Sequence, residues 1–195
     1  MQQHPSEEKT LVIIKPDGIQ RNLIGEIISR YERVGLKVVG MKMMHATEDL
    51  IKNHYTLDPG WFKSVGEKGI KGLLDKGIQP ESMDPDVMAH AVLKRLIVYM
   101  TSGPIIAIVL QGAHAVKIVR KITGGTEPLT SDVGTIRGDY VLDSYSMSND
   151  DDRAVRNLVH ASGSVKEAED EIKHWFNDEE IVKYVLVNDE VLYGR

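Results

Sequence analysis

The chain has 195 residues, 42% of them hydrophobic and 27% charged, which is the composition of a soluble globular protein rather than a disordered or membrane one. Its formal net charge of −5 disfavours a role in coating nucleic acid, although a local cluster of Arg and Lys could still bind small anions. The absence of cysteine excludes disulfide scaffolds, thiolate metal sites and cysteine nucleophiles. The N-terminus, MQQHPSEEKT, lacks the apolar run of a signal peptide, and no stretch approaches the roughly 20 apolar residues of a membrane span, so we expect a cytoplasmic protein.

The first quarter of the chain alternates strand and helix patterns. A short β-rich run at residues 11–14 predicts a buried strand, which a Pro-Asp-Gly turn at residues 16–18 ends. Apolar residues then recur at helical spacing over residues 23–34, and Gly35 stands where a helix C-cap is expected. A second strand is predicted at residues 36–44.

The middle of the chain is less regular. After a short helix predicted at residues 49–55, repeated Gly and Pro over residues 58–95 predict several short pieces. A helical pattern follows at residues 86–99. The almost wholly apolar stretch at residues 105–110 predicts a third, buried strand, and residues 113–122 are again helical.

The last part of the chain predicts a long irregular loop at residues 124–138, a short extended piece at residues 157–160 and a helix at residues 165–176. Ser164 and Glu167 have the spacing of a capping box at the start of that helix. This order of elements suits an α/β (α+β) ferredoxin-like sandwich, in which a four-stranded, mainly antiparallel sheet is covered by helices.

Several cations and polar groups stand at the ends of predicted elements. Lys15 follows the first strand and points its ammonium group toward any cleft above the sheet. Arg120 lies on a helix, Arg137 ends the long loop, and Thr126 sits in a Gly-Gly-Thr turn. Each alone is more often a solvated or salt-bridged residue, but together they could converge on one anion through charge-assisted hydrogen bonds.

His160 differs from the other histidines in its surroundings, NLVHASGS. It follows a β-prone run and precedes small, flexible residues at a helix start, where backbone amides favour a phosphate. The other histidines are interpreted as surface or boundary residues, because none has the partner spacing of a metal site. The residues alone are equally compatible with a functional and a structural His160.

Six segments of the sequence resemble the nucleoside diphosphate kinase family. They occur in family order, cover most of residues 9–193 and read IIKPDGIQRNLIGEII, VGMKMMHATEDLIKNHY, MTSGPIIAIVLQG, GTIRGDY, NLVHASGS and AEDEIKHWF. The resemblance implies a single domain over residues 1–195 that transfers the γ-phosphate of a nucleoside triphosphate, mainly ATP, to a nucleoside diphosphate. The implied mechanism is ping-pong, through a phosphorylated His160.

The resemblance also implies a role for each matching residue. His160 would be the nucleophile, Glu171 would orient its ring, and Ser162 lies beside it. Lys15 would act in catalysis and, with Asn157, reach the ribose hydroxyls. The residues expected to hold the phosphates and the sugar are Lys15, Tyr55, Arg120, Thr126, Arg137 and Asn157.

The base, the metal and the assembly complete what the resemblance implies. Trp61 or Phe62 would stack on the base, unless they only pack under an inserted segment. Mg²⁺ would be held mainly by the nucleotide phosphates, with no protein metal site. The partners would be nucleoside tri- and diphosphates and further copies of the chain, as a hexamer or tetramer, with no membrane or nucleic acid required.

The chain departs from the family pattern at three places. Gly163 stands where the family has an aspartate, and two insertions fall at about residues 59–95 and 141–153, as in an archaeal-type branch. The acidic run at residues 150–152 is interpreted as a solvated loop, with a metal site or a subunit contact as alternatives.

Two other classes of function have different sequence requirements. A non-catalytic, nucleotide-binding regulatory module would be favoured by loss of the nucleophile, but His160 is present. A metal-dependent hydrolase would need a histidine or carboxylate cluster near His160, and the sequence spacing shows none.

Overall fold

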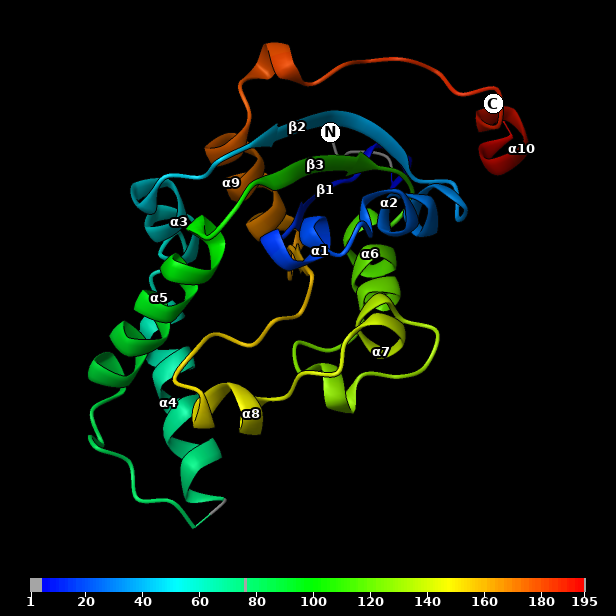
Figure 1. Ribbon diagram of the computed structural model, residues 1–195. Coiled ribbons are helices and arrows are strands. Elements are labelled where there is room, and N and C mark those ends of the chain that lie inside the picture. Colours follow the sequence, from blue (N-terminus) through cyan, green and yellow to red (C-terminus); the bar gives the residue numbers. More distant parts are fainter. Residues whose placement is uncertain (1–4, 76, 195) are drawn as a thin grey trace.

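The structure, a computed structural model, describes residues 5–75 and 77–194. Within these residues one antiparallel sheet has the strand order β2-β3-β1-β4, and its strands are β1 (Lys9–Ile14), β2 (Lys37–Met44), β3 (Ile105–Gln111) and β4 (Val159–Ala161). The predicted four-stranded sheet covered by helices is therefore confirmed (Figure 1). No helix in the described part of the chain is both long and apolar enough to cross a membrane.

Helices cover both faces of this sheet. Their bounds are α1 (Pro16–Gln20), α2 (Ile24–Glu32), α3 (Glu48–Tyr55), α4 (Trp61–Leu74), α5 (Pro85–Thr101), α6 (Ala115–Thr123), α7 (Ile136–Tyr140), α8 (Tyr145–Asp150), α9 (Val165–Trp175) and α10 (Asp189–Tyr193). Short 3-10 turns lie at Pro5–Glu7, Pro128–Thr130 and Asp178–Glu180.

The alternating side chains of β1 divide the core into two clusters, because successive residues of a strand point to opposite faces. Val12 and Ile14 pack with α2 and α6 on one face. Leu11 and Ile13 pack with α3, α9 and the end of α5 on the other. All four side chains are fully buried, so the strand that leads to Lys15 is fixed from both sides.

The prediction of several short pieces over residues 58–95 is wrong, because α4 runs as one helix of 14 residues through Gly66, Gly69 and Gly72. A Cβ atom at Gly66 would lie 1.9 Å from the carbonyl oxygen of Pro85, at the start of α5. Glycine thus lets α4 and α5 pack closely side by side. This tertiary contact outweighs the low helix propensity of glycine.

Two boundaries in the C-terminal half also differ from the prediction. The loop expected over residues 124–138 ends in α7, whose N-cap Thr135 accepts a hydrogen bond from the backbone N–H of Gly138. The strand expected from Asn157 begins only at Val159, because Leu158 has a left-handed backbone with φ of +63°. The sequence pattern carried no signal for this turn.

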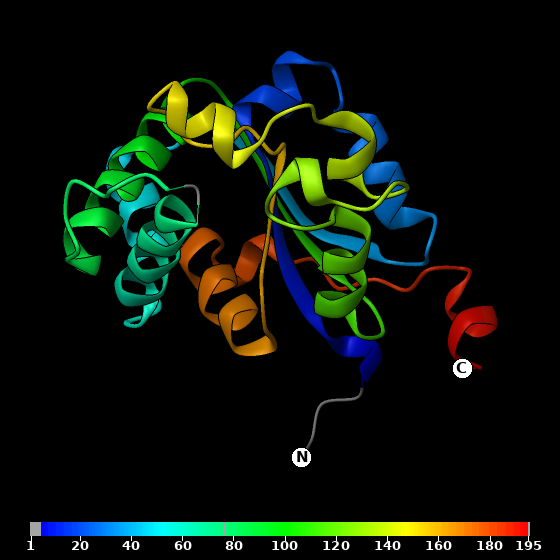
Figure 2. The same cartoon turned by 90° about the horizontal axis from the view of Figure 1, so that it is seen from below.

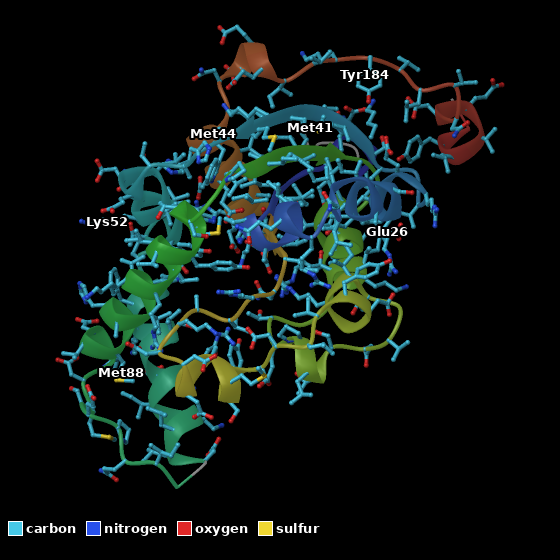
Figure 3. The ribbon with its side chains drawn as sticks, viewed as in Figure 1. Glu26, Met41, Met44, Lys52, Met88 and Tyr184 are labelled. Atoms are coloured by element: carbon cyan, nitrogen blue, oxygen red, sulfur yellow. The ribbon has the colours of Figure 1, made fainter. Side chains whose placement is uncertain are left out.

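The segment after α9 runs along the outer edge of the sheet to α10 (Figure 3). The backbone N–H of Val182 donates to the carbonyl of Val39 at 2.7 Å, and the Tyr184 hydroxyl donates to the carbonyl of Val38 at 2.7 Å. The C-terminal segment therefore covers part of the edge strand β2. Met41, farther along β2, remains 57% exposed.

The second predicted insertion, residues 141–153, is anchored by a buried carboxylate. Asp143 is 7% exposed, and its carboxylate accepts two hydrogen bonds from Arg153, at 2.6 and 3.0 Å. It also accepts hydrogen bonds from the backbone N–H groups of Ser144 and Arg156, at 2.9 and 2.7 Å. The acidic run at residues 150–152 is solvent-exposed as predicted, but Asp150 is the last residue of α8 rather than part of a loop.

We expect Asp143→Ala to lower the free energy of unfolding by about 2 kcal/mol, because it leaves several donors without their shared acceptor. Urea unfolding followed by circular dichroism measures this change. Asp150→Ala, which removes an exposed carboxylate of α8, serves as the matched control and should change the stability by less than about 0.5 kcal/mol. Equal effects of the two variants would show that Asp143 does not anchor the insertion.

Candidate active site

His160 lies in β4, opposite Ile13 of β1. The segment that leads to β4 passes between the α4–α5 pair on one side and α6–α7 on the other (Figures 1 and 2). Lys15 directly follows β1, two residues beyond Ile13, so the pairing of β1 with β4 brings His160 and Lys15 to the same end of the two strands. The sheet therefore brings together residues 145 positions apart in the chain, counted from Lys15 to His160.

Glu171 of α9 lies directly behind the His160 ring. Nε2 of His160 is 2.8 Å from Oε1 of Glu171, within ion-pair distance but without the alignment of a full hydrogen bond. The Glu171 residue is 3% exposed, and its Oε2 accepts a hydrogen bond from the Ser162 hydroxyl at 2.6 Å. A carboxylate at Nε2 favours the tautomer protonated there, which leaves the Nδ1 lone pair free for chemistry.

His54, predicted from the sequence to be a surface or boundary histidine, is buried behind the same pair. Its Nδ1 accepts a hydrogen bond from the indole N–H of Trp175 at 3.1 Å and lies 3.7 Å from Oε1 of Glu171. The His54 and His160 rings meet edge to face, with centroids 4.5 Å apart. Burial, together with the charges of neighbouring basic groups, holds the pKa of His54 well below its usual range, so this ring is neutral.

Two sequence signals could have placed His54 inside the fold. It follows Ile51 by three positions and Leu50 by four on a predicted helix, which is the spacing of one helix face. Ile51 is fully buried and Leu50 packs against the same cluster, so His54 faces inward.

The structure brings together a cluster that sequence spacing did not reveal. Ligand atoms of His54, His160 and Glu171 all lie within 4.8 Å of one another. His160 and Glu171 contact each other directly, however, and Trp175 occupies Nδ1 of His54. Two imidazoles and one carboxylate also do not suit Mg²⁺, which prefers oxygen ligands. The arrangement fits a nucleophile with its orienting carboxylate better than a metal centre.

Lys15 is buried at the other side of the site. It is 5% exposed, and its ammonium group donates to Oδ1 of Asn157 at 2.6 Å. The Asn157 amide nitrogen in turn donates to the carbonyl of Thr126 at 2.9 Å. These three predicted site residues therefore form one connected group, and the hydroxyl-bearing residue Thr126 is exposed.

Burial lowers the pKa of Lys15 to about 7, with the nearby Arg137 charge acting in the same direction and Asp17 against it. Near neutral pH the ammonium group is therefore poised between its two forms. A bound phosphate would favour the charged form, because an opposite charge nearby raises the pKa of a lysine.

This pKa has a consequence for stability. The unfolded chain keeps the ordinary lysine pKa of 10.5, so between pH 7 and 10.5 it binds more protons at Lys15 than the folded chain. The free energy of unfolding should therefore rise with pH from about 7 toward 9, by up to about 1 kcal/mol per pH unit. Urea unfolding at a series of pH values measures this slope for wild type and Lys15→Met.

The Lys15→Met variant should lack that part of the slope. Lys52→Met, which removes an exposed lysine of α3 (Figure 3), serves as the matched control and should keep it. If wild type and Lys15→Met gave parallel stability curves, the low pKa of Lys15 would be refuted.

The two predicted arginines lie in different environments. Arg137 is 7% exposed, and its guanidinium donates hydrogen bonds to the backbone carbonyls of Gly124, Gly125, Asn157 and Val159. Arg120 is exposed on α6, and its guanidinium forms no hydrogen bond or ion pair with any described residue. Arg137 thus ties the loop after α6 to the segment before His160, while Arg120 has its guanidinium free for a ligand.

A row of aromatic rings leads away from the site. Tyr55 lies edge-on to His54, with centroids 4.8 Å apart, and Trp61 is 6.0 Å from Tyr55. Phe62 packs instead on His90 of α5, at 4.6 Å. Trp61 is therefore the ring on the active-site side of α4. Burial raises the pKa of the Tyr55 hydroxyl, so this hydroxyl stays protonated at neutral pH.

Gly163, where the family pattern has an aspartate, is covered by a carboxylate from α9. Glu167 accepts a hydrogen bond from the backbone N–H of Gly163 at 2.9 Å, and a Cβ atom at Gly163 would lie 2.6 Å from the same oxygen. Ser164 caps α9 as predicted, accepting from the Glu167 N–H at 3.1 Å. In a full capping box the Glu167 carboxylate would accept from the backbone N–H of Ser164, but here it accepts from that of Gly163. The predicted capping box is therefore half formed.

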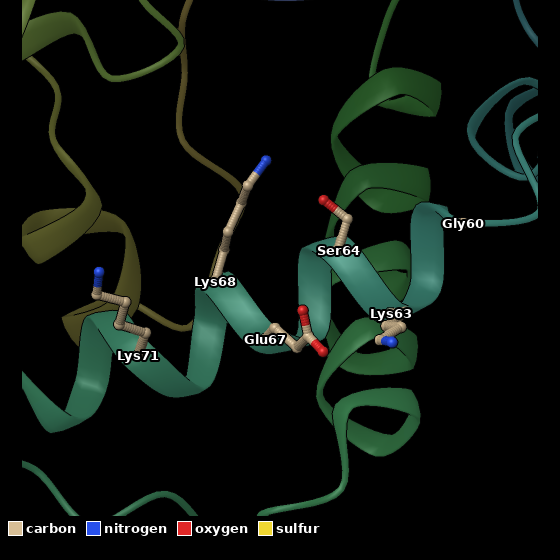
Figure 4. A pocket seen from close by; sticks show the side chains of 6 residues that line it. All are labelled: Gly60, Lys63, Ser64, Glu67, Lys68 and Lys71. Carbon is tan, nitrogen blue, oxygen red and sulfur yellow. The ribbon is translucent and has the colours of Figure 1, made fainter.

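A separate pocket of about 360 Å³ lies along α4, lined by Gly60, Lys63, Ser64, Glu67, Lys68 and Lys71. Ser64, Lys68 and Lys71 extend to the same side of the helix (Figure 4). Lys63, Glu67 and Lys71 follow one another at four-residue spacing, which is the pattern of a solvated, alternately charged helix face. None of these side chains belongs to the predicted site.

Comparison with known proteins decides the family. A family model described as nucleoside diphosphate kinase matches residues 8–62 and 86–181. The chain belongs to the nucleoside diphosphate kinase family. It is 46% identical to a nucleoside diphosphate kinase of Pyrobaculum aerophilum over 180 residues, covering 90% of this chain and 98% of that one. It is 37% identical to the enzyme of Borreliella burgdorferi over 177 residues, covering 91% and 92% of the two chains.

Solved structures of nucleoside diphosphate kinases share the fold. The crystal structure of the Pyrobaculum aerophilum NDP kinase aligns with a TM-score of 0.88 at 44% identity, covering 91% of this chain and all of that one. The Borrelia burgdorferi enzyme, solved as a transition-state mimic with bound vanadate and ADP, aligns with a TM-score of 0.80 at 35% identity, covering 96% and 98%. The predicted ferredoxin-like fold and nucleoside diphosphate kinase activity are therefore confirmed. As a member of this family the enzyme binds nucleotides, and its phosphotransfer uses a divalent cation.

Proposed function

We propose that this nucleoside diphosphate kinase carries the transferred phosphate on Nδ1 of His160. The observation that carries the proposal is the 2.8 Å contact between Nε2 of His160 and the buried carboxylate of Glu171. This contact directs Nδ1 away from the carboxylate as an unprotonated nucleophile. Glu171 also stabilises the positive charge that the ring gains as Nδ1 forms its bond to phosphorus.

The reaction consists of two displacements at one site. The Nδ1 lone pair of His160 attacks the γ-phosphorus of ATP, the bond to the β–γ bridging oxygen breaks, and ADP leaves with the electron pair. The terminal phosphate oxygen of a nucleoside diphosphate then attacks the phosphorus on His160. The N–P bond breaks, the electron pair returns to Nδ1, and a nucleoside triphosphate leaves.

The other predicted residues hold the nucleotide. Arg120, whose guanidinium forms no hydrogen bond or ion pair with a described residue, and the exposed Thr126 would bind the phosphates. Lys15 and Asn157, already joined at 2.6 Å, would bind phosphate and ribose together, with the Tyr55 hydroxyl beside them. Arg137 would hold the backbone around Asn157 and the Gly124–Gly125 loop in place, since its guanidinium donates hydrogen bonds to four carbonyls there.

The base and the cation complete the proposal. Trp61 would stack on the base, because its ring lies next to Tyr55 whereas Phe62 packs on His90. Mg²⁺ would enter with the nucleotide and be held by its phosphates, since the cluster of His54, His160 and Glu171 offers too few oxygen ligands for this ion. When bound, the ion neutralises charge that develops on the phosphates. The vanadate and ADP in the Borrelia burgdorferi enzyme support phosphoryl transfer at this kind of site.

Four further sequence predictions remain proposals. The chain would act as one domain over residues 1–195, with insertions at about residues 59–95 and 141–153, in the cytoplasm, and as a homo-oligomer, either hexamer or tetramer. The family match, which skips residues 63–85, supports an insertion there. A non-catalytic regulatory role has no support, because the chain belongs to a family of enzymes and keeps His160.

The test is to incubate the purified protein with γ-labelled ATP and Mg²⁺, isolate it and measure the bound label. A phosphohistidine releases its label in acid and retains it in alkali, and peptide mapping should place it on His160. Addition of unlabelled GDP should then move the label to GTP. A wild-type protein that binds ATP but takes up no label on His160 would refute the proposed mechanism.

A further inference from the structure

The backbone immediately before His160 is strained. The Val159 N–H donates to the Asn157 carbonyl at 2.7 Å, which closes a γ-turn around Leu158. Leu158 has φ of +63°, a conformation that residues with a branched side chain rarely adopt. Its side chain is fully buried, so the residue cannot relax outward into solvent. Such strain persists only where surrounding contacts enforce it.

Two residues at the end of β1 and the start of α1 hold this turn in place. The Leu158 N–H donates to Oδ2 of Asp17 at 3.2 Å, and the Leu158 carbonyl accepts from the Lys15 N–H at 2.8 Å. The other Asp17 oxygen accepts a hydrogen bond from the Tyr99 hydroxyl at 2.6 Å. Both Asp17 and Tyr99 are less than one tenth exposed.

The turn connects two parts of the proposed site. Asn157, on one side of Leu158, binds the Lys15 ammonium group and the Thr126 carbonyl. His160 lies two residues after Leu158 and enters the sheet with Val159. A change in the Leu158 backbone would therefore move the nucleophile and the nucleotide-binding amide relative to each other.

We infer that Asp17 is a positioning residue for phosphoryl transfer: its buried carboxylate, fixed by Tyr99, holds the strained Leu158 turn that sets His160 against Asn157. Asp17 does not contact the nucleotide in this account, because Tyr99 and Leu158 occupy its two oxygens. The inference rests on the proposed role of His160 and adds the element that orients it.

A hydrogen-bonding role for Asp17 can be separated from a role of its charge. In Asp17→Asn the amide oxygen can accept from the Leu158 N–H, while the amide nitrogen donates to the Tyr99 oxygen. The rate of His160 phosphorylation at saturating labelled ATP, measured in a single turnover, should therefore stay within about threefold of wild type. Asp17→Ala, which removes both bonds, should slow the same step by about tenfold or more.

Variants of Leu158 test whether Asp17 acts through the strained backbone at Leu158. Leu158→Ala and Leu158→Gly remove nearly the same side chain, but only glycine adopts a positive φ without strain. Adding Asp17→Ala should therefore slow phosphorylation by about tenfold in the Leu158→Ala background and by less than about threefold in the Leu158→Gly background. A purely structural role of Asp17 would give the same loss in both.

Equal losses in the two backgrounds, or an Asp17→Asn variant as slow as Asp17→Ala, would overturn the inference. Tyr99→Phe removes the Tyr99 bond to Asp17, together with the hydrogen bond between the Tyr99 oxygen and the Asn157 backbone, and serves as the second test if Asp17→Ala does not fold. It should slow phosphorylation more in the Leu158→Ala background than in the Leu158→Gly background, and equal losses would again overturn the inference. Failure of wild type to form phospho-His160 would instead refute the proposed mechanism itself.

Discussion

His160→Gln should lose nucleoside diphosphate kinase activity by about 10⁴-fold or more, because the variant has no imidazole nitrogen to carry the phosphate. Glutamine is close in size to histidine and the ring is 15% exposed at its side chain, so the fold should be kept. The coupled formation of GTP from ATP and GDP measures the loss. Single-turnover labelling with γ-labelled ATP should show no phosphoenzyme.

The control for this variant is His45→Gln. His45 is exposed between β2 and α3, outside the proposed site, and its replacement should leave both activity and labelling unchanged. Thermal unfolding of the two variants separates a catalytic loss from misfolding. Labelling of His160→Gln at the wild-type rate would place the phosphate on another residue.

Arg137→Met should lower both the stability of the protein and the rate of His160 phosphorylation. The variant removes the Arg137 donor from four carbonyls, of which those of Asn157 and Val159 are buried, and we expect the free energy of unfolding to fall by about 3 kcal/mol. Because these carbonyls belong to the Gly124–Gly125 loop and to Asn157 and Val159, the site also loses its geometry. The rate of His160 phosphorylation should fall by about 10²- to 10³-fold.

Arg120→Met is the matched comparison. Arg120 carries the same charge but is exposed, and its guanidinium forms no hydrogen bond or ion pair with a described residue. Its replacement should slow phosphorylation by a factor similar to that of Arg137→Met, while urea unfolding changes by less than about 0.5 kcal/mol. If Arg137→Met were as stable as wild type, the buried guanidinium would not be what joins the two segments.

The parts of the fold that the sequence predicted are those with a strong local pattern. β1, β3 and α2 follow from continuous apolar runs or helical periodicity, and their predicted bounds agree with the structure within one or two residues. The long helix α4 was missed because glycine disfavours helices locally. Only the close contact of Gly66 with Pro85, which is 19 positions away, explains its use there.

The proposed site shows the same division. His160, Glu171, Lys15 and Arg137 lie in the family segments of the sequence, and the structure brings His160 to Glu171 and Lys15 to Asn157. The buried His54 and the pair of Asp17 and Tyr99 were not predicted as part of the site. Asp17 and Tyr99 are 82 positions apart, and no local pattern reports a contact across that distance.

The way Asp143 closes the second insertion determines how sequence changes inside it can act. Asp143 and Arg153 are ten positions apart and form the neck of a loop that contains α8. Lengthening such a loop costs only the entropy of a longer closed chain, about 0.6 kcal/mol for each doubling in length. Because the neck also fixes the N–H of Arg156, next to Asn157, the loop can gain or lose residues without moving the nucleotide-binding amide. The insertion can thus change in length at little cost in free energy, although its buried Ser144 and Ser148 restrict its composition.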